Sequence, residues 1–414
     1  MVLRKTIIPL GGLGTRLRPL TVETSKALVR FLNRPLIEFT IVKLAKQGVT
    51  EFYMGVSGYF NYREVYDYFG EGLKIRVKYD LPNVRIRYQP NEESIGSADC
   101  VRIIMDYYDI REPVLIVQGD LLFDIDLQSM WAFHIKNNSF MTIAVKYLEK
   151  EEELSHFGVA DIDSENRIRR FVEKPKTLKE APSNFINTGI YVLSTGFRDF
   201  LNSDIVNYMR QRNMMDFGQH IIPLVIQMFG SVYAYELKGY WFDIGTPERY
   251  LEAVFYLLQH MTPEELEAKP LTPNVKVQGK SRESNMLHQE ILSKIVRGEI
   301  KTDGEILIGR HVKIGKNVSL SDSVVDNYTI IEDEVNINRS VVMDRCRIGA
   351  RTSISNSIIG RHVRIQKNVK IVNSVIGDDT IIGDNVTLVN TRVWAHKEIS
   401  PNAHIENKIF SYPY

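Results

Sequence analysis

The chain has 414 residues, and its 52 Lys and Arg against 51 Asp and Glu give a formal net charge of +1. This length favours two domains, and the balanced charge gives no reason to expect binding to nucleic acid or to a membrane surface. The two cysteines, Cys100 and Cys346, lie far apart, which indicates a reducing compartment rather than a disulfide framework. The first apolar run is too short for a signal peptide or a membrane span, so we expect a cytoplasmic protein.

The first part of the chain alternates β-rich runs with amphipathic stretches. The pattern predicts strands at Thr6–Leu10, Glu51–Val56, Val114–Gln118 and Met141–Tyr147. It predicts helices at Pro35–Gln47, Gln128–Asn137 and Pro247–Gln259. We therefore expect an α/β domain with a mostly parallel, Rossmann-like sheet over residues 1–260. Residues 261–304 are expected to be a connecting segment with one helix near Met286–Val296.

The tail from residue 305 to residue 414 is organised as a repeat. Similar triplets recur every 17 residues, beginning at Ser323, Ser340, Ser357, Ser374 and Thr391. Such self-similarity predicts a solenoid whose coils bury aliphatic residues only against their neighbours. Short motifs such as IGRHVK and IGDNVT resemble the left-handed parallel β-helix family, which implies about five coils of three faces. A rigid module for homo-oligomerisation is the expected role.

The stretch GGLGTRLRPLT follows the first predicted strand. Glycines allow the backbone to approach an anion closely, and a helix N-terminus would add a favourable field. The spacing matches neither G-x-G-x-x-G nor the P-loop, and glycines also form ordinary tight turns. Arg16 in the turn and Lys26 ten residues later favour a phosphate site. Arg18 is expected to lie on the surface.

Five motifs in order resemble the sugar-1-phosphate nucleotidyltransferases, also called nucleotide-sugar pyrophosphorylases. They are the glycine stretch with SKAL at Ser25–Leu28 and NRPLIEFTI at Asn33–Ile41, QGD at Gln118–Asp120, FGVADIDSENRIRRFVEKP at Phe157–Pro175, NTGIYVL at Asn187–Leu193, and GYWFDIGTPERYL at Gly239–Leu251. In this family a β-helix tail is a common appendage. The resemblance implies attack of a sugar 1-phosphate oxygen on the α-phosphorus of a nucleoside triphosphate, which expels pyrophosphate. Such in-line transfer needs positioning and charge neutralisation rather than a covalent enzyme intermediate.

The resemblance also implies site residues. Arg16 would stabilise the departing phosphates and Lys26 would act at the α-phosphate. Asp120 and Asp243 would hold Mg²⁺. The nucleotide would contact Leu10, Gly11, Gly12, Gly14, Thr15, Gln89, Gly96 and Ser97. The sugar phosphate would contact Gly158, Glu173, Lys174, Asn187 and Gly189.

The residues by themselves support part of this assignment. Asp120 ends an apolar strand, where open α/β sheets place ligand-binding groups, and two carboxylates plus substrate phosphates are a usual Mg²⁺ site. Helix capping by Asp120 and backbone pairing of Asp243 are the alternatives. Asp124 and Asp126 are expected to cap a helix or be solvated. Glu173 and its neighbour Lys174 on an extended segment should point to opposite faces.

The expected base pocket, QPNEESIGSADCV, departs from the family pattern. Gln89 presents an amide to a base edge, whereas Asp99 and Cys100 stand where other residues are usual, which leaves the nucleotide open. The other motifs are most similar to the mannose-1-phosphate guanylyltransferase branch, so GTP and mannose 1-phosphate giving GDP-mannose is the first hypothesis. Uridylyl or thymidylyl transfer to glucose 1-phosphate or N-acetylglucosamine 1-phosphate is the alternative.

Two further classes of function remain. A catalytically inactive, regulatory sugar-nucleotide-binding subunit would be expected to lose Lys26, Asp120, Lys174 or Asp243, and all four are present. An acyltransferase in the tail could use a histidine as its base. The uninterrupted repeat argues against the loop that such enzymes carry; the candidate histidines are His311, His362, His396 and His404.

Overall fold

The structure is a computed structural model that describes residues 3–12, 14–56 and 58–411. By contacts between Cα atoms the chain divides into two compact units. The first unit comprises Met1–Gly12 and Ile37–Asp243, and the second comprises Leu13–Leu36 and Ile244–Tyr414. The chain therefore passes from one unit to the other within the glycine stretch.

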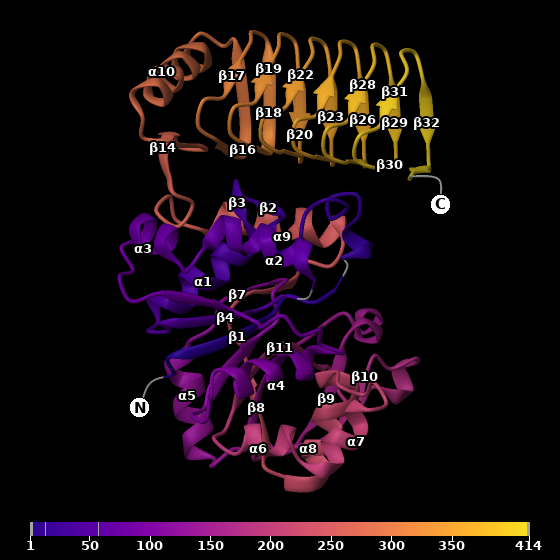
Figure 1. Ribbon diagram of the computed structural model, residues 1–414. Helices are drawn as coiled ribbons and strands as arrows, with labels where there is room; N and C mark the ends of the chain where they lie inside the picture. Colours follow the sequence, from indigo (N-terminus) through magenta and orange to yellow (C-terminus); the bar gives the residue numbers. More distant parts are fainter. Residues whose placement is uncertain (1–2, 13, 57, 412–414) are drawn as a thin grey trace. The chain divides into compact units, whose positions relative to one another are not determined.

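The first unit is built on a nine-stranded sheet in which β1 occupies a central position (Figure 1). Parallel pairing joins β6 (Val114–Val117), β1 (Lys5–Pro9), β4 (Glu51–Gly55) and β5 (Arg85–Tyr88). Beyond β6, the long strand β11 (Phe185–Leu193) runs antiparallel to β6 and to β8 (Met141–Tyr147). The remaining strands are β9 (Gly158–Ile162), β10 (Ile168–Glu173) and β12 (Val232–Glu236). The predicted α/β class and all four predicted strands are confirmed.

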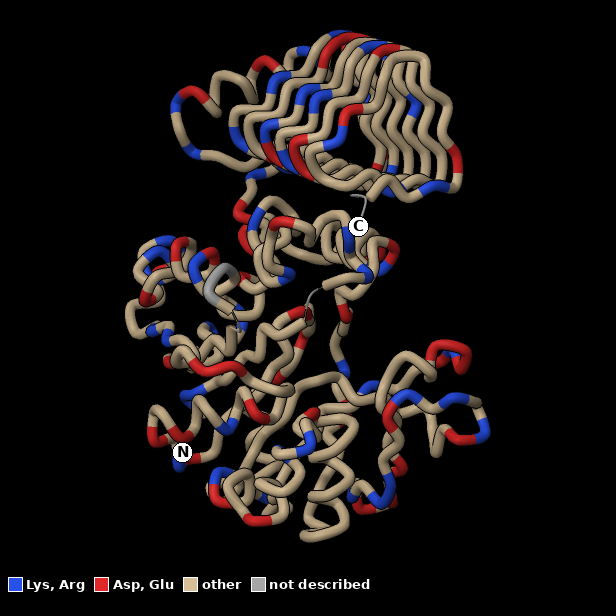
Figure 2. The backbone as a smooth tube through the Cα atoms, turned by 45° about the vertical axis from the view of Figure 1, so that its right-hand side comes forward, with Lys and Arg blue, Asp and Glu red and all other residues tan. Residues whose placement is uncertain are grey.

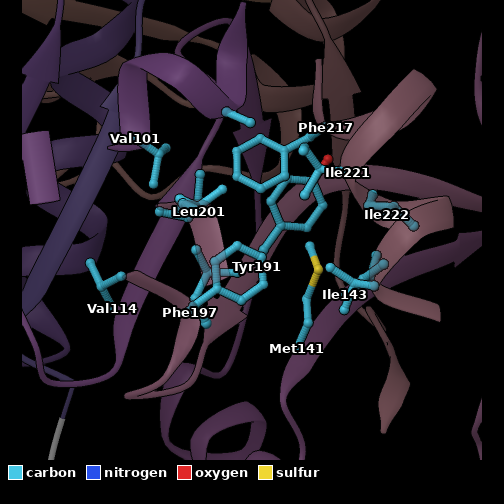
Figure 3. Packing of buried hydrophobic residues seen from close by; sticks show 14 of the residues in the cluster. Val101, Val114, Met141, Ile143, Tyr191, Phe197, Leu201, Phe217, Ile221 and Ile222 are labelled. Atoms are coloured by element: carbon cyan, nitrogen blue, oxygen red, sulfur yellow. The ribbon is translucent and has the colours of Figure 1, made fainter. Parts of the chain in front are cut away.

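Helices cover this sheet and bury its apolar residues. They are α1 (Leu36–Lys46), α2 (Tyr59–Phe69), α3 (Leu73–Tyr79), α4 (Ser97–Tyr107), α5 (Leu127–Lys136), α6 (Phe197–Leu201), α7 (Asp204–Arg210) and α8 (Ile222–Phe229), with short turns η3 (Glu151–His156), η4 (Leu178–Glu180) and η5 (Phe217–Ile221). Figure 3 shows part of the core, where Tyr191 and Phe217 pack with ring centroids 5.2 Å apart. Each such buried side chain contributes about 1.5–3 kcal/mol of burial free energy.

The non-repetitive part of the second unit consists of short elements. They are η1 (Thr15–Leu17), η2 (Lys26–Leu28), β2 (Arg30–Phe31), β3 (Arg34–Pro35), α9 (Pro247–His260), β14 (Ala268–Thr272), β15 (Val275–Gln278) and α10 (Arg282–Val296). The predicted helices are confirmed. Helix α10 begins before the predicted Met286 because Ser281 caps it, its hydroxyl accepting a 3.1 Å hydrogen bond from the Ser284 backbone nitrogen.

The tail folds into a parallel β-helix, which we call the solenoid (residues 300–411; Figure 1). Its strands pair in three ladders with a register that advances 17 residues, so that Val324 pairs with Val341 and Ile358 pairs with Val375. The strands are β16 (Ile300–Ile308), β17 (Lys313–Ile314), β18 (Val318–Val325), β19 (Ile330–Ile331), β20 (Asn336–Asn338), β21 (Val341–Val342), β22 (Arg347–Ile348), β23 (Ser353–Ser355), β24 (Ile358–Ile359), β25 (Arg364–Ile365), β26 (Lys370–Val372), β27 (Val375–Ile376), β28 (Ile381–Ile382), β29 (Thr387–Val389), β30 (Arg392–Val393), β31 (Glu398–Ile399), β32 (His404–Glu406) and β33 (Ile409–Phe410).

The repeated hydroxyl residue of each coil has a structural reason. The Ser357 hydroxyl donates to the Ser355 carbonyl at 2.7 Å and accepts from the backbone nitrogen of Ser374 in the next coil at 3.0 Å. Ser340 and Ser374 repeat this arrangement one coil away in each direction. The column is almost fully buried. A small side chain with both a donor and an acceptor is needed there, because a buried backbone donor without a partner is costly.

No helix in the described part of the chain is long and apolar enough to span a membrane.

The solenoid core should be sensitive to the loss of single aliphatic side chains. Ile371 is fully buried in β26, between Ile354 and Leu388 of the adjacent coils. We expect Ile371→Ala to destabilise the solenoid by about 2–5 kcal/mol. The loss should appear as faster amide hydrogen exchange concentrated in β23, β26 and β29, since each coil contacts only its neighbours. The matched control is Lys370→Ala, at the exposed neighbouring position; an equal effect of both changes would contradict this account.

Candidate active site

The carboxyl ends of β1 and β6 meet at one edge of the sheet in the first unit. Leu10 and Gly11 follow β1, and the QGD motif follows β6. The Gly119 backbone nitrogen donates to the Pro9 carbonyl at 3.1 Å. A Cβ at Gly119 would come within 2.2 Å of the Leu10 side chain and 3.1 Å of the Pro9 carbonyl oxygen, so glycine favours this close approach. The two predicted motifs are therefore side by side, at an edge where open α/β sheets bind ligands.

The segments that carry Asp120 and Asp243 become neighbours through a separate two-stranded pairing. Strand β7 (Leu121–Phe123) pairs antiparallel with β13 (Trp241–Asp243), and Asp243 lies opposite Leu121, next in sequence to Asp120. Both carboxylates are half-buried. Because Asp120 is followed by a strand, its alternative role as a helix cap is excluded. Carboxylates on neighbouring segments have the hard-oxygen chemistry that Mg²⁺ prefers, since it usually takes one or two protein carboxylates plus phosphates and water, and a joint metal site of Asp120 and Asp243 stays a prediction.

The nearby carboxylates of Asp124 and Asp126 make structural contacts. Asp126 caps α5, accepting a 3.0 Å hydrogen bond from the Ser129 backbone nitrogen, as expected. Asp124 forms an ion pair with Lys43.

The NTG motif lies beside QGD on β11. The Asn187 side chain is held at both ends: its Nδ2 donates to the Tyr191 hydroxyl at 2.9 Å, and its Oδ1 accepts from the Gly189 nitrogen at 3.0 Å. Gly189 has a φ of +76°, and a Cβ there would lie 2.8 Å from the Gln118 side chain. Glycine is therefore required for both conformation and space. The Trp241 indole donates to the Thr188 carbonyl at 3.0 Å, which ties β13 to this motif.

Glu173 occupies a slot between two glycines. A Cβ at Gly158 would lie 2.6 Å from the Glu173 carboxylate, and a Cβ at Gly218 would lie 2.4 Å from it. Burial raises the pKa of Glu173 above its ordinary value, although Lys174 opposes the shift and Asp216 adds to it. Gly158 of the FGV motif thus leaves space for the Glu173 carboxylate. The contact of Gly218 with Glu173 was not predicted, because nothing in the sequence around Gly218 indicates it.

The prediction that Glu173 and Lys174 point to opposite faces is wrong. Lys174 follows the end of β10 and has a φ of +47°, so the extended segment on which the prediction rested stops at Glu173. The two side chains instead form an ion pair with 3.6 Å between Nζ and Oε1. The Glu173 side chain is 18% exposed and that of Lys174 is 59% exposed, which leaves the ammonium group accessible.

Gln89 lines a cavity of about 1340 Å³ beside β5. The side chain is 5% exposed, and its Nε2 donates to the Glu92 carbonyl at 2.6 Å. Within the described part of the chain its buried Oε1 has no hydrogen-bond partner. A buried amide oxygen in this condition is costly unless a ligand or water donates to it, which supports the predicted role in binding.

The rest of the expected base pocket has packing functions. A Cβ at Gly96 would lie 2.4 Å from the Met215 carbonyl, and the Ser97 hydroxyl accepts from the Phe217 nitrogen at 3.0 Å. Asp99 forms a buried ion pair with Arg102 at 2.8 Å. The ion pair with Arg102 gives Asp99, which departs from the family pattern, a role in the packing of α4. The contact of Gly96 and Ser97 with the nucleotide stays a prediction.

The glycine stretch continues in the second unit. Gly14 has a φ of +57°, and its carbonyl accepts from the Thr21 hydroxyl at 2.7 Å. The expected helix is only one turn of 3₁₀-helix, η1, because Arg18 precedes a proline and adopts an extended conformation. Thr15 and Arg16 are exposed on this turn. Gly11, Gly12 and the residues from Asp120 to Asp243 belong to the first unit, whereas Gly14, Thr15, Arg16 and Lys26 belong to the second.

The mixed sheet with the glycine stretch and the QGD motif at one edge is the setting in which we compare the chain with known families. The family model for nucleotidyl transferases matches residues 5–260, and the chain belongs to this family. A model of the GMPPB C-terminal domain matches residues 297–410.

Curated relatives agree with this membership, and a solved structure shares the fold. Mannose-1-phosphate guanyltransferase beta-B of Xenopus laevis is 33% identical over 281 residues, which are 66% of this chain and 71% of the relative. Glucose-1-phosphate adenylyltransferase of Mycoplasma mobile is 27% identical over 75% of this chain and 83% of the relative. UDP-glucose pyrophosphorylase from Acinetobacter baumanii has a similar fold, with a TM-score of 0.52 and 22% identity over 63% of this chain and 95% of its own.

The burial of Glu173 should appear in the pH dependence of sugar-phosphate binding. Its raised pKa means that the carboxylate takes up a proton at a higher pH than an ordinary glutamate, whose pKa is about 4.3. If the carboxylate accepts a hydrogen bond from a sugar hydroxyl, KM for the sugar 1-phosphate should rise as the pH falls through the raised pKa of Glu173. Glu173→Gln should remove this acid limb, whereas the exposed control Glu165→Gln should keep it. An unchanged profile in Glu173→Gln would contradict the assignment.

Proposed function

We propose that this chain transfers a nucleotidyl group from a nucleoside triphosphate to a sugar 1-phosphate, releasing pyrophosphate, and that its substrates are GTP and mannose 1-phosphate. The observation that supports the reaction is the pairing of β7 with β13, which makes the segments that carry Asp120 and Asp243 neighbours beside the strand ends. The choice of substrates is supported by relatives named mannose-1-phosphate guanyltransferase in Xenopus laevis and Danio rerio. Uridylyl, thymidylyl or adenylyl transfer to glucose 1-phosphate or N-acetylglucosamine 1-phosphate is the alternative.

In this proposal each part of the chain has one task. Arg16 and Lys26 supply positive charge to the triphosphate, Arg16 at the departing phosphates and Lys26 at the α-phosphate. Lys174 binds the sugar phosphate, and Glu173, Asn187 and the Gly189 backbone orient the sugar. Asp120 and Asp243 hold Mg²⁺, which when bound neutralises charge on the phosphates. Because no group of the enzyme becomes covalently attached, the rate depends on in-line positioning and on charge at the phosphates.

Gln89 is proposed to read the base. Its Nε2 already donates to the chain, so the base must offer a donor to Oε1. Guanine offers N1–H and the N2 amino group side by side on one edge, which gives a buried acceptor two donors within reach. A site built around a buried polar group rejects a base that leaves the group unpaired.

We also propose that copies of the chain assemble through the solenoid, whose stacked ladders offer a rigid and regular surface. We propose a cytoplasmic location, because Cys100 and Cys346 lie far apart in the sequence and do not form the disulfide framework of an oxidising compartment.

The proposed reaction predicts one productive substrate pair. We would measure pyrophosphate release with Mg²⁺ for GTP, UTP, dTTP, ATP and CTP against mannose 1-phosphate, glucose 1-phosphate and N-acetylglucosamine 1-phosphate. The highest kcat/KM is expected for GTP with mannose 1-phosphate. Pyrophosphate release with a different substrate pair would support the proposed reaction and contradict the proposed substrates. No release with any pair, with nucleotide binding retained, would contradict the reaction and favour a regulatory subunit.

The carboxylate pair should be needed for turnover and not for folding. Asp120→Asn and Asp243→Asn keep the shape of each side chain and remove its charge, so each is expected to lower Mg²⁺-dependent kcat by about 100-fold or more. Asp124→Asn is the matched control, since this nearby carboxylate pairs with Lys43. Circular dichroism should be unchanged in all three variants. Near-normal activity in either Asp120→Asn or Asp243→Asn would remove that residue from the metal site.

A further inference from the structure

Residues 14–36, which we call the phosphate loop, pack with the solenoid. They belong by their contacts to the same compact unit as α9 and the solenoid. This loop carries Arg16 and Lys26. The second unit therefore contains part of the proposed site, since the phosphate loop and the solenoid belong to one compact unit.

The solenoid contacts the loop from one corner of its repeat. Asp326 and Trp394 occupy the same position of the 17-residue repeat, and the next position holds Asp344, Arg361 and Asp378. At the first of these positions other coils carry glycine, as at Gly360 and Gly377. A Cβ at Gly360 would lie 2.6 Å from Asp378, so the coils that carry glycine have no room for a side chain there. Charged residues of both signs recur along the coils in Figure 2.

Arg361 makes a contact that joins the loop to two coils. Its guanidinium donates to the Thr24 hydroxyl at 2.7 Å, two residues before Lys26. The same guanidinium pairs with Asp378 of the next coil at 2.6 Å, and the Arg361 backbone nitrogen donates to Asp378 at 2.8 Å. Asp378 is 7% exposed. A planar guanidinium fixed by a buried carboxylate has one orientation, so it sets the position of Thr24.

Two more contacts hold the part of the loop that precedes Thr24. His396 and Glu23 approach to 2.6 Å, and one carboxylate oxygen of Asp379 lies within 4.8 Å of both groups. Arg18 lies over the Trp394 ring, 5.3 Å from its centroid. Arg18, expected to lie on the surface, is half-buried because of this ring. A cation over a tryptophan contributes about 0.5–2 kcal/mol, depending on its exposure.

The far end of the loop is fixed in the same way. Arg30 forms an ion pair with Asp326, whose side chain is 2% exposed, and its Nε lies 3.5 Å from Asp344. The Tyr250 hydroxyl of α9 donates to the Arg30 carbonyl at 2.5 Å. Burial raises the pKa of Asp326, and Arg30 opposes the shift. Removing one partner of a buried ion pair strongly destabilises the fold. Arg30 and Asp326 are therefore needed for the folding of the loop and are not chosen as test positions.

We infer that Arg361, Trp394 and His396 of the solenoid are positioning residues for the nucleotidyl transfer. They act through Thr24, Arg18 and Glu23 and hold the phosphate loop in the conformation that presents Arg16 and Lys26 to the triphosphate. The inference rests on the proposed function. It also gives His396 a partner in the loop in place of the role of acyltransferase base.

The physical reason is the cost of leaving the loop unordered. The described loop has only two-residue strands and single turns of helix, so its own backbone hydrogen bonds cannot hold two long cationic side chains in place. A displacement of about 1 Å in a positioning group can lower a rate by about 100-fold. The solenoid supplies rigidity because each coil is fixed by its neighbours on both sides.

The test compares Arg361→Ala, Trp394→Ala, His396→Ala and the triple variant with wild type, all as the full chain. We expect the triple variant to lose about 10- to 100-fold in kcat and to show a raised KM for GTP. The KM for mannose 1-phosphate should change little, because Glu173, Lys174 and Asn187 are held by contacts in the other unit. Arg361→Lys and Trp394→Phe should recover part of the loss, since they keep a cation and a ring.

The matched control is Arg351→Ala. Arg351 is an exposed solenoid arginine that donates to Asn368 of the next coil at 2.6 Å, away from the corner described above. Its removal should leave kcat, both KM values and hydrogen exchange of the loop unchanged. Amide exchange in residues 14–31 should become faster in the corner variants and not in this control.

Two results would overturn the inference. One is unchanged kcat, GTP KM and loop exchange in the triple variant. The other is a loss of activity that accompanies a change in native mass while loop exchange stays unchanged. If wild type transfers no nucleotide, the proposed function fails separately, and calorimetric affinity for GTP replaces turnover. Equal GTP affinity in triple variant and control then overturns the inference, whereas a loss confined to the triple variant supports it.

Discussion

The parallel pairing of β1 with β6 is the interaction on which the rest of the site depends. It brings the residues after Pro9 and those after Val117 to one edge of the sheet, although they are more than 100 residues apart in the chain. Gly119 and Gly189 then let three backbone segments approach without side chains between them. Strand β7 continues directly from this edge, and its pairing with β13 adds Asp243. The register of β1 with β6 thus sets where the QGD motif lies, and the separate pairing of β7 with β13 sets where Asp243 lies beside it.

Burial and charge are divided between the two units in different ways. In the first unit, the Gln89 amide oxygen is buried without a hydrogen-bond partner among the described residues, and the Glu173 carboxylate is mostly buried although it pairs with the exposed Lys174. Such groups are costly to the fold, which is usual where they serve a ligand. In the second unit, buried charges such as Asp326 and Asp378 are paired with arginines. These pairs provide orientation for the phosphate loop rather than binding.

The sequence was informative where a local pattern alone decides the structure. The alternation of apolar residues predicted the four strands from Thr6 to Tyr147, and the 17-residue period predicted the solenoid, because stacked coils require equal lengths. The glycine stretch and QGD were recognisable as site motifs. The helix expected after Gly14 was wrong because the proline after Arg18 stops it at one turn. The opposite orientation of Glu173 and Lys174 was wrong because one residue with positive φ ends the strand between them.

By itself the sequence determined the family, the α/β class, the repeat and the chemical types of the site residues, since these depend on periodicity and on motifs within short segments. Only the tertiary structure decided which residues surround Glu173, why Asp99 departs from the pattern, and that the loop with Arg16 and Lys26 packs on the solenoid. These facts depend on contacts that local patterns do not show, some of them between residues far apart in the chain, such as Thr24 with Arg361. A local pattern contains no information about such contacts, because backbone pairing and close packing choose them only when the whole chain is folded.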